Sequence, residues 1–559
     1  MTSPFKALLS AGSNAALRTA LAASLLTLVA CGGGSGSSGP EPRYSGFSSS
    51  SISFRSSSSS SSAPVGPDLT WTKGVYADAD DFWSLCENPR SGIAPYNDLP
   101  YPDQAGSSAA ENFFLRSLTH DYYLWYDEVA DIDPALYSTA DYFAQMKTTA
   151  RTPTGTLKDQ FHWSDNTAEY RKRNESGLEA GYGAVWVMIS PAPPRQALVS
   201  YVQPNSPAAQ QGLSRGAQIL EIDGVDFIND NTKTGVETLS TGLYPEALNE
   251  SHTFKLLDLN ASNPRTVTLT SAETTIAPTP TVKTLATSSG KVGYILFNSH
   301  IATAETALAN AIEQLRSAGV NDLVLDIRYN GGGYLDIANQ LAYMIAGDKA
   351  RNKTFSTIQF NDKHPSIDPF TGYDLTPQAF HSTTLGFSES GGQALPTLNL
   401  NRVYVLTGGN TCSASESIIN GLRGIDVDVV QIGTATCGKP YGAYMVDNCG
   451  ESYFTVQFKS ANAKGYGEYS DGFFPGGAAS SNPAELPGCQ IGDDYTHLLG
   501  DPSEARLAAA LHYRKTGSCP AVPTSKGQSS AQKFHSNAHT SDEGKIRQPR
   551  GLGDMILRR

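Results

Sequence analysis

A regular alternation of apolar strands and helices is the feature that most constrains the fold of this 559-residue chain. Runs with the length and composition of buried strands lie at residues 291–297, 322–328, 402–408 and 427–433. Helical patterns lie between them, at residues 302–319, 335–347 and 413–424. Such alternation predicts a parallel sheet covered by helices. We therefore expect an α/β core within residues 276–520.

Two loops of this core carry groups that can do chemistry. "YNGGGY" at residues 329–334 follows the second strand, and "NTCSAS" at residues 410–415 follows the third. The carboxyl ends of parallel strands meet at one edge of a sheet, where ligands usually bind. We expect the two loops to lie together at that edge.

Ser413 has two interpretations. Ser413 and Glu416 have the spacing of a capping box, which stabilises a helix by about 1 kcal/mol and implies no reaction. The same helix start offers N–H groups and a partial positive charge, which stabilise a developing oxyanion. The glycines at residues 331–333 let a substrate approach the backbone closely. This stretch alone favours the cap, so the rest of the chain must decide.

Lys439 follows Ser413 after one helix, one strand and short turns, which can return the chain to the same edge of the sheet. A serine hydroxyl is a weak nucleophile and needs an adjacent base. A lysine accepts a proton only as the neutral amine, which burial or nearby cations favour. The alternative is a solvated loop lysine.

The N-terminus has the pattern of an export signal. Residues 1–31 combine Lys6 and Arg18 with an apolar stretch that is shorter than the roughly 20 residues of a membrane span. The stretch "LVAC" resembles the bacterial lipobox, which implies a lipid on Cys31, and Gly32 favours the outer membrane. An ordinary secretory signal or a chance apolar patch are the alternatives. We expect a Ser/Gly-rich linker at 32–67 and a disordered, solvated tail at 521–559.

Charge and cysteine content limit the classes of partner and cofactor that the chain can bind. The net charge of −13 argues against nucleic acid. Seven cysteines minus Cys31 leave six, and an even number outside the cytoplasm predicts disulfides whose pairing the sequence cannot choose. No paired C-x-x-C or clustered histidine is present, so we expect no metal and no other cofactor.

Residues 68–175 have the pattern of a small helical domain. Phe114, Leu118, Tyr122 and Trp125 are expected on one helical face, as core, and a second helix begins near Ser138 or Thr139.

Residues 176–275 contain five predicted strands separated by turn signals. Within them, residues 204–224 resemble the middle of a PDZ domain. The resemblance implies that a peptide C-terminus adds as a strand beside a carboxylate-binding loop, here Gly181, Tyr182 and Gly183. A simple hairpin turn is the alternative for that loop.

Together, "LVLDIRYNGGG", "NTCSASESIINGL" and "IGTATCGKPYG", preceded by the PDZ segment, resemble the S41 family of serine peptidases, the C-terminal processing peptidases and their tricorn-like relatives. The resemblance implies a ClpP/crotonase-like core. It also implies Ser413 as nucleophile, with Ser415 as the less favoured choice, and Lys439 as base. The implied oxyanion donors are the amides of Ala414 and of a glycine in 331–333, preferably Gly332.

One position departs from the family pattern. Many processing peptidases have a glutamine four residues after the lysine, where it orients the base, but this chain has Ala443. Either another residue orients Lys439, or the enzyme is a simple dyad, or it is impaired. His300 is a further candidate, although a structural loop histidine is the favoured interpretation.

Two further features remain open. A disulfide between Cys412 and Cys437 would tie the two catalytic loops together. The Gly/Pro/Ser content of residues 350–398 indicates a surface loop or lid.

The resulting hypothesis is a lipid-anchored envelope endopeptidase that acts on proteins or peptides captured by their C-termini. The alternatives are an inactive PDZ-bearing scaffold and crotonase-type acyl chemistry. The PDZ segment and the export signal argue against the latter, because coenzyme A is cytoplasmic.

Overall fold

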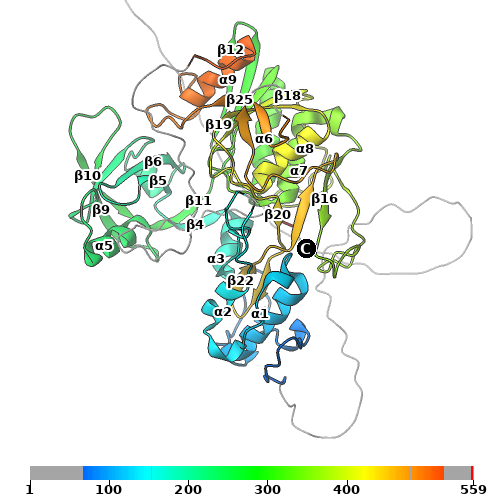
Figure 1. Ribbon diagram of the computed structural model, residues 1–559. Coiled ribbons are helices and arrows are strands. Elements are labelled where there is room, and N and C mark those ends of the chain that lie inside the picture. Colours follow the sequence, from blue (N-terminus) through cyan, green and yellow to red (C-terminus); the bar gives the residue numbers. More distant parts are fainter. Residues whose placement is uncertain (1–66, 153, 477–480, 522–554, 558–559) are drawn as a thin grey trace, which may run out of the picture. The chain divides into compact units, whose positions relative to one another are not determined.

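The computed structural model describes residues 67–152, 154–476, 481–521 and 555–557 (Figure 1). The export signal, the lipobox with Cys31, the linker up to residue 66 and the tail at 522–554 and 558–559 lie outside the described residues. Among the described helices, none is long and apolar enough to cross a membrane.

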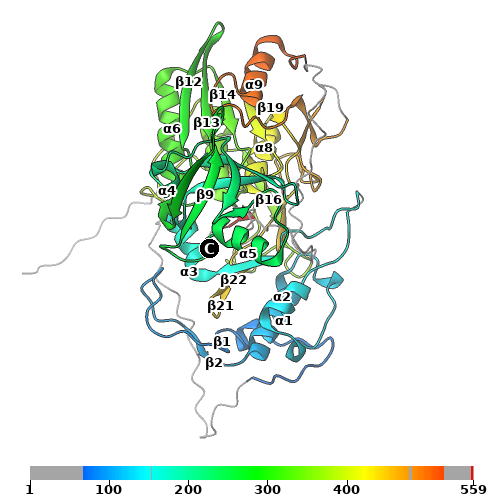
Figure 2. The ribbon, with the colours of Figure 1, turned by 90° about the vertical axis from the view of Figure 1, so that its left-hand side faces the viewer.

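The predicted α/β core is confirmed. Its central strands are β13 (Gly290–Leu296), β14 (Asp322–Asp326), β18 (Arg402–Thr407) and β19 (Asp428–Gly433), which are neighbours and parallel. On the far side of β19 follow β25 (Glu485–Gln490) and β24 (Phe474–Gly476), which were not predicted. β12 (Thr281–Thr287) pairs antiparallel with β13, and α6 runs along them (Figure 2).

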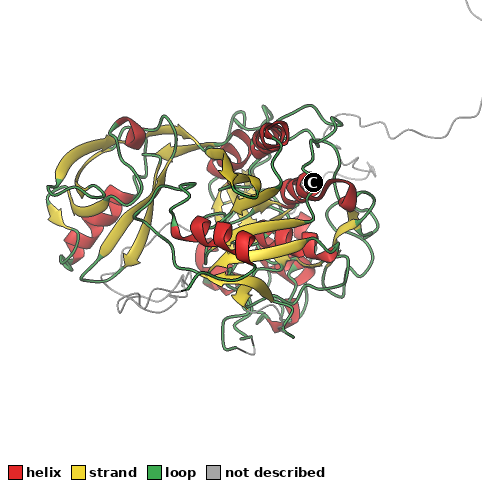
Figure 3. Ribbon diagram, turned by 90° about the horizontal axis from the view of Figure 1, so that it is seen from above, coloured by secondary structure: helices red, strands yellow, loops and turns green. Residues whose placement is uncertain are grey.

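Helices cover both faces of this sheet, as the view from above shows (Figure 3). One face packs against α6 (Ala304–Ala318), α7 (Leu335–Ala346) and α8 (Ala414–Gly424). The other packs against α9 (Ala505–Thr516). Alternate residues of a strand point to opposite faces, so strands buried on both sides are continuously apolar. That double burial is why the four core strands were visible in the sequence.

Residues 176–275 form a separate antiparallel sheet with its own apolar core. Its strand order is β10-β9-β7-β6-β5, and helix α5 (Lys233–Leu243) packs against it. The strands are β5 (Ala184–Ser190), β6 (Gln196–Val202), β7 (Gln218–Ile222), β9 (Ser251–Leu257) and β10 (Arg265–Thr270), with the short β8 (Val225–Asp226) and helix α4 (Pro207–Gln210). All five predicted strands are present. β4 (Leu178–Gly181) pairs with β11 (Ala272–Thr275) where this region begins and ends.

The first described region is only partly helical. It contains α1 (Ser108–Tyr122), α2 (Thr139–Gln145) and α3 (Thr167–Arg171), and also β1 (Leu85–Cys86), β2 (Gln104–Ala105) and β3 (Trp163–Asn166). β3 pairs with β22 (Glu451–Phe454), so this region shares a sheet with a strand from the region of the α/β core.

Two details of that region test the helix predictions. The placement of Trp125 on a helical face is wrong, because α1 ends at Tyr122 and the next residue is extended. Trp125 instead packs edge-on against Tyr441, with 4.9 Å between ring centroids. Ser138 caps α2 by accepting a hydrogen bond from the amide of Asp141, as expected.

The 350–398 segment is better anchored than a surface loop. It contains β16 (Thr354–Gln359) and β17 (Gln378–Ala379), and its Phe355 and Phe380 are buried in the main core. The buried carboxylate of Glu305 accepts hydrogen bonds from amides of this segment, Leu385 and Phe387 among them. β16 continues a sheet with β23 (Phe458–Ala461) and β20 (Tyr441–Gly442).

All six remaining cysteines pair, as Cys86–Cys449, Cys412–Cys437 and Cys489–Cys519. The proposed Cys412–Cys437 bridge is therefore confirmed. Three disulfides indicate an oxidising compartment outside the cytoplasm.

The expectation of a disordered tail through residue 559 is wrong at its far end. Met555–Ile556 forms strand β26, which pairs with β15 (Gly333–Tyr334). The remaining short strand is β21 (Val446–Asn448), which pairs with β22.

Candidate active site

The glycine loop and the serine loop meet at Asn330. Its carbonyl accepts hydrogen bonds from the Cys412 amide at 3.1 Å and from the Ser415 hydroxyl at 2.9 Å. Ser415 is thus engaged with the neighbouring loop. The end of β14 that carries Asn330 is held by Arg328, a fully buried guanidinium that pairs with Asp326 and Glu504. The expected meeting of the two loops at the carboxyl ends of the strands is confirmed.

Ser413 occupies an unusual backbone conformation. Its φ of 61° and ψ of −115° lie in a region that side-chain-bearing residues rarely adopt, and α8 begins at the next residue. The side chain is fully buried, and its Oγ has no hydrogen-bond partner among the described residues. A capping hydroxyl would bond to an amide of the first helical turn. The hydroxyl thus makes no well-aligned bond to the first helical turn, although Ser413 and Glu416 keep the capping-box arrangement in which the Glu416 carboxylate accepts from the Ser413 amide.

Glu416 is the central residue that the sequence reasoning underrated. It accepts hydrogen bonds from the amides of Ser413 at 2.9 Å, Gly438 at 2.9 Å and Lys439 at 2.8 Å, and from the Thr436 hydroxyl. Burial raises the pKa of this carboxyl, and the four hydrogen bonds act in the opposite direction. One side chain thus joins the backbones of the two proposed catalytic residues. The capping-box spacing was the only signal for it, and it pointed to a local role.

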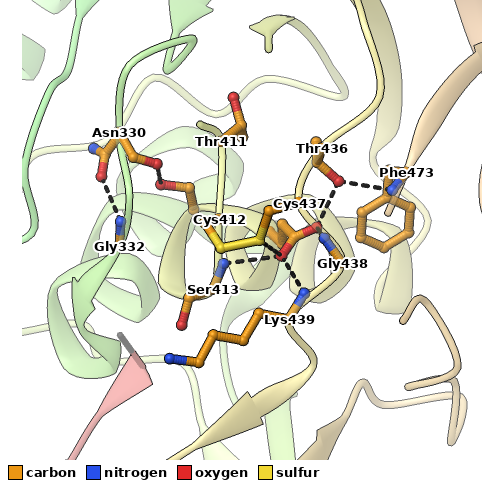
Figure 4. Close-up of a disulfide and its surroundings, with 12 residues drawn as sticks. Asn330, Gly332, Thr411, Cys412, Ser413, Thr436, Cys437, Gly438, Lys439 and Phe473 are labelled. Carbon is orange, nitrogen blue, oxygen red and sulfur yellow. Dashed lines mark hydrogen bonds between the residues drawn. A yellow bond between two sulfur atoms is a disulfide. The ribbon is translucent and has the colours of Figure 1, made fainter. Parts of the chain in front are cut away.

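Lys439 is 3% exposed and lies on the loop that the Cys412–Cys437 disulfide joins to the serine loop. Its side chain extends so that the amine lies on the same side of the disulfide as the Ser413 hydroxyl (Figure 4). The amine also lies 5.0 Å from the centroid of the Phe161 ring, a cation–π distance. The structure therefore orients Lys439 through Glu416, the disulfide and an aromatic ring, at a site where Ala443 has no polar side chain.

Hydrogen bonds of the Asn330 side chain fix the conformation of the glycine loop. The Asn330 side chain accepts a hydrogen bond from the Gly332 amide at 3.0 Å and donates to the Phe297 carbonyl at 3.0 Å. Gly332 and Gly333 have φ of 110° and 129°, which favour glycine. A Cβ on Gly333 would lie 2.5 Å from the carbonyl oxygen of His300. The amide expected to bind the oxyanion, that of Gly332, is thus already engaged with Asn330.

His300 supports this loop. Its Nδ1 lies 2.9 Å from Asn330 Oδ1, which can only accept, so Nδ1 carries the proton. Its amide donates to the Gly332 carbonyl, and its carbonyl accepts from the Tyr334 amide. Burial lowers the pKa of His300 to about 3, against the raising effect of those hydrogen bonds. A neutral, structural histidine, the favoured interpretation, agrees with these contacts.

Two groups of described residues have the ligand spacing of a metal site. They are Cys86 with Glu111 and Cys449, and Cys412 with Glu416 and Cys437. In both groups the sulfurs are already joined in disulfides. Thiolates, not disulfides, bind metals.

The proposed carboxylate-binding loop lies between β4 and β5. Tyr182 is buried, and its hydroxyl donates to the Gly242 carbonyl at the end of α5. Gly183 has φ of 71°, and a Cβ there would lie 2.3 Å from the Cβ of Ser206. β5, which follows this loop, is the edge strand of the sheet. An edge strand after a glycine-containing loop is the geometry that strand addition requires.

Comparison with known families agrees with this geometry. The family model for peptidase family S41 matches residues 291–459, which include the glycine loop, Ser413 and Lys439. The PDZ domain model matches residues 176–240. The region that carries the candidate site therefore resembles peptidase family S41.

Individual relatives agree with these matches. Over 143 residues the chain is 32% identical to a carboxyl-terminal-processing protease of Picosynechococcus sp., which is 25% of this chain and 32% of that protein. Over 161 residues it is 30% identical to carboxyl-terminal-processing peptidase 2, chloroplastic, of Arabidopsis thaliana, which is 28% of this chain and 29% of that protein. The matches thus span about a third of the length of these curated relatives.

Its fold is similar to the crystal structure of a candidate S41 protease from Bacteroides fragilis. The TM-score is 0.53 and the identity 23%, over 75% of this chain and 98% of that chain. At that identity the likeness shows the fold alone.

Proposed function

We propose that this chain is a serine endopeptidase that cleaves proteins or peptides through a Ser413–Lys439 dyad and an acyl-enzyme. One observation carries the proposal. A buried serine with a strained backbone, whose hydroxyl has no hydrogen-bond partner among the described residues, faces a buried lysine. One carboxylate, Glu416, holds both backbones. A cap or a solvated lysine would need neither the strain nor the burial.

The reaction follows the serine peptidase scheme. The neutral amine of Lys439 accepts the proton of Ser413 as the hydroxyl oxygen attacks the scissile carbonyl. Lys439 then protonates the leaving amine, the C–N bond breaks, and an ester forms on Ser413. Water, deprotonated by Lys439, hydrolyses that ester and restores the serine.

The oxyanion would be stabilised at the start of α8. The Ala414 amide is the first donor, because it lies beside the nucleophile where the helix dipole is positive. The second donor comes from the glycine loop. Gly332 can serve if its hydrogen bond to Asn330 opens, and otherwise the adjacent Gly331 amide takes this role.

Substrates would be captured by their C-termini on the PDZ domain. The edge strand β5 supplies backbone groups, and Gly181, Tyr182 and Gly183 form the carboxylate-binding loop. A peptide with a free C-terminal carboxylate should bind more tightly than its amide, measured by fluorescence anisotropy.

The lipobox supports attachment to the cell envelope through a lipid on Cys31, on the outer membrane. Substitution Cys31→Ser should abolish incorporation of labelled palmitate and release the protein from the membrane fraction.

The dyad is tested by proteolysis of a fluorescently labelled, unfolded casein. Ser413→Ala and Lys439→Ala should each lose cleavage, whereas Lys464→Ala, at an exposed lysine, should not. A p-nitrophenyl ester should leave an acyl adduct on Ser413 that mass spectrometry detects. Cleavage by both active-site variants at the wild-type rate would refute the dyad.

The second candidate is a scaffold that binds C-termini without cutting them. Ala443 favours it, because the side chain that orients the base in many relatives is missing. Wild-type protein that binds C-terminal peptides but never cleaves them, and forms no adduct, would establish that function instead.

A further inference from the structure

A short segment near the end of the sequence forms part of a small sheet at the catalytic loops. Met555 pairs with Gly333 and Ile556 with Tyr334, in parallel register. On its other side, Ile556 bridges Ala443, and the Leu557 amide donates to the Ala443 carbonyl at 3.3 Å.

The two flanking strands come from the two catalytic loops. β15 continues the glycine loop, and Ala443 lies four residues after Lys439, directly after β20. Figure 4 shows β26, in the faded red of the end of the chain, on the side to which the Lys439 amine points. The segment at 555–557 therefore lies between the proposed oxyanion loop and the proposed base loop.

The side chains of this segment are bound as well as its backbone. Ile556 is 4% exposed and packs in a cluster with Tyr170 and Phe454. Leu557 is 7% exposed and joins the main core cluster. The site thus has an apolar surface for two consecutive aliphatic side chains, in addition to backbone pairing.

This arrangement is the one that a substrate would take. Extended peptides bind by adding a strand, with backbone bonds for affinity and side-chain pockets for specificity. The segment is also separated from the folded core by 33 residues, 522–554, a length that spans on the order of 100 Å when extended. The segment therefore pairs with strands that are distant from it in the sequence.

The burial of the two proposed catalytic residues agrees with a peptide-binding site that is already occupied. Ser413 is fully buried and Lys439 is 3% exposed, so a substrate cannot reach them in this arrangement. Something must move before catalysis, and the segment at 555–557 lies between the two loops that carry these residues.

We propose that residues 555–557 are a built-in pseudosubstrate that closes the peptide-binding groove of its own chain. This proposal rests on the proposed peptidase function. It implies that the substrates are extended polypeptides with two consecutive aliphatic residues, which would take the places of Ile556 and Leu557. Removal of the segment opens the groove.

The kinetic test compares the full chain with a variant that ends at Asp554, on unfolded casein. A segment that competes with substrate raises KM and leaves kcat unchanged, so truncation should lower KM by about tenfold if the groove is closed nine-tenths of the time. In the full-length chain, Ile556→Asp should act like the truncation. Its matched control, Ile546→Asp, makes the same change in the same tail and should leave KM unaltered. Equal KM in all four proteins would overturn the proposal, whether or not the truncated variant is less stable.

The binding test does not depend on catalysis. A fluorescent peptide of residues 550–559 should bind the truncated Ser413→Ala variant, and bind the full-length Ser413→Ala chain at least tenfold more weakly. The peptide carrying Ile556→Asp and Leu557→Asp should bind neither. Binding of this pattern without cleavage by any protein would refute the peptidase function and keep the groove assignment. Cleavage without peptide binding would keep the peptidase function and overturn the pseudosubstrate.

Discussion

The Cys412–Cys437 disulfide offers a way to separate the geometry of the site from the stability of the fold. It joins the residue before the proposed nucleophile to a residue two before the proposed base, across a sequence separation of 25. Cys489–Cys519 closes a separation of 30 away from these loops. Because the loop-closure entropy depends only weakly on length, both bridges should stabilise the chain by about 3.5 kcal/mol.

The perturbation is a pair of double variants, Cys412→Ala with Cys437→Ala and Cys489→Ala with Cys519→Ala. Alanine avoids a second hydroxyl beside Ser413. Both variants should lose a similar free energy of unfolding, measured with urea. Only the first should lose activity, because it removes the covalent link between the two proposed catalytic loops and leaves the Glu416 hydrogen bonds to hold them. A displacement of about 1 Å between nucleophile and base can reduce kcat by up to about 100-fold.

The assay is kcat on unfolded casein, at a temperature where circular dichroism shows both variants folded. A tenfold or greater loss of kcat in the first variant, with less than a twofold loss in the second, is the expected result. Equal kcat in the two variants would show that the disulfide contributes stability and no catalytic geometry.

Three further outcomes are expected. In Glu416→Gln the new NH2 group faces backbone amides that now donate hydrogen bonds to the carboxylate. We therefore expect kcat to fall at least tenfold in a kinetic assay, and the free energy of unfolding to fall by about 2 kcal/mol in a urea titration. Burial alone would raise the pKa of Asp131, but hydrogen bonds from Arg116 and two N–H groups outweigh it and lower the pKa from 3.8 to about 2. The Asp131–Arg116 ion pair therefore stabilises the fold by about 2 kcal/mol above about pH 4, and this contribution is lost as the pH falls through about 2. At that low pH the urea midpoints of wild type and Asp131→Asn should converge. Burial lowers the pKa of His300 from 6.5 to about 3, so in that window only the unfolded chain takes up this proton. As the pH falls from about 6.5 to about 3, the free energy of unfolding of wild type should therefore decrease by about 1.4 kcal/mol per pH unit more than that of His300→Gln. Parallel curves of unfolding free energy against pH for the two proteins would contradict this reasoning.

The four core strands could be predicted because burial on both faces makes each of them continuously apolar. The strands β24 and β25 could not, because Pro475 and Pro487 interrupt them and they pair only through the completed sheet. The end of α1 was missed for a related reason. The aromatic spacing continues past Tyr122, but the chain turns there so that Trp125 can pack against Tyr441.

The residues of the candidate site also divide into those that the sequence predicts and those that it does not. Ser413 and Lys439 were identified from motif and order along the chain, and the PDZ region from one turn-and-strand pattern. The role of Glu416 was not, since the spacing to Ser413 describes a helix cap equally well. Its bonds to Gly438 and Lys439 exist only because β19 returns the chain beside α8.

The sequence by itself determined the four core strands, the five strands of residues 176–275, the motifs that carry Ser413 and Lys439, and an even number of cysteines available for disulfides. These depend on short-range periodicity and residue chemistry. Tertiary structure decided which cysteines pair, how Ser413 is strained, what holds Lys439 in place of a residue at Ala443, and that Ile556 lies between the catalytic loops. Each of these joins segments far apart in the chain, and the free energy of such contacts depends on a closed, buried geometry that no local pattern records.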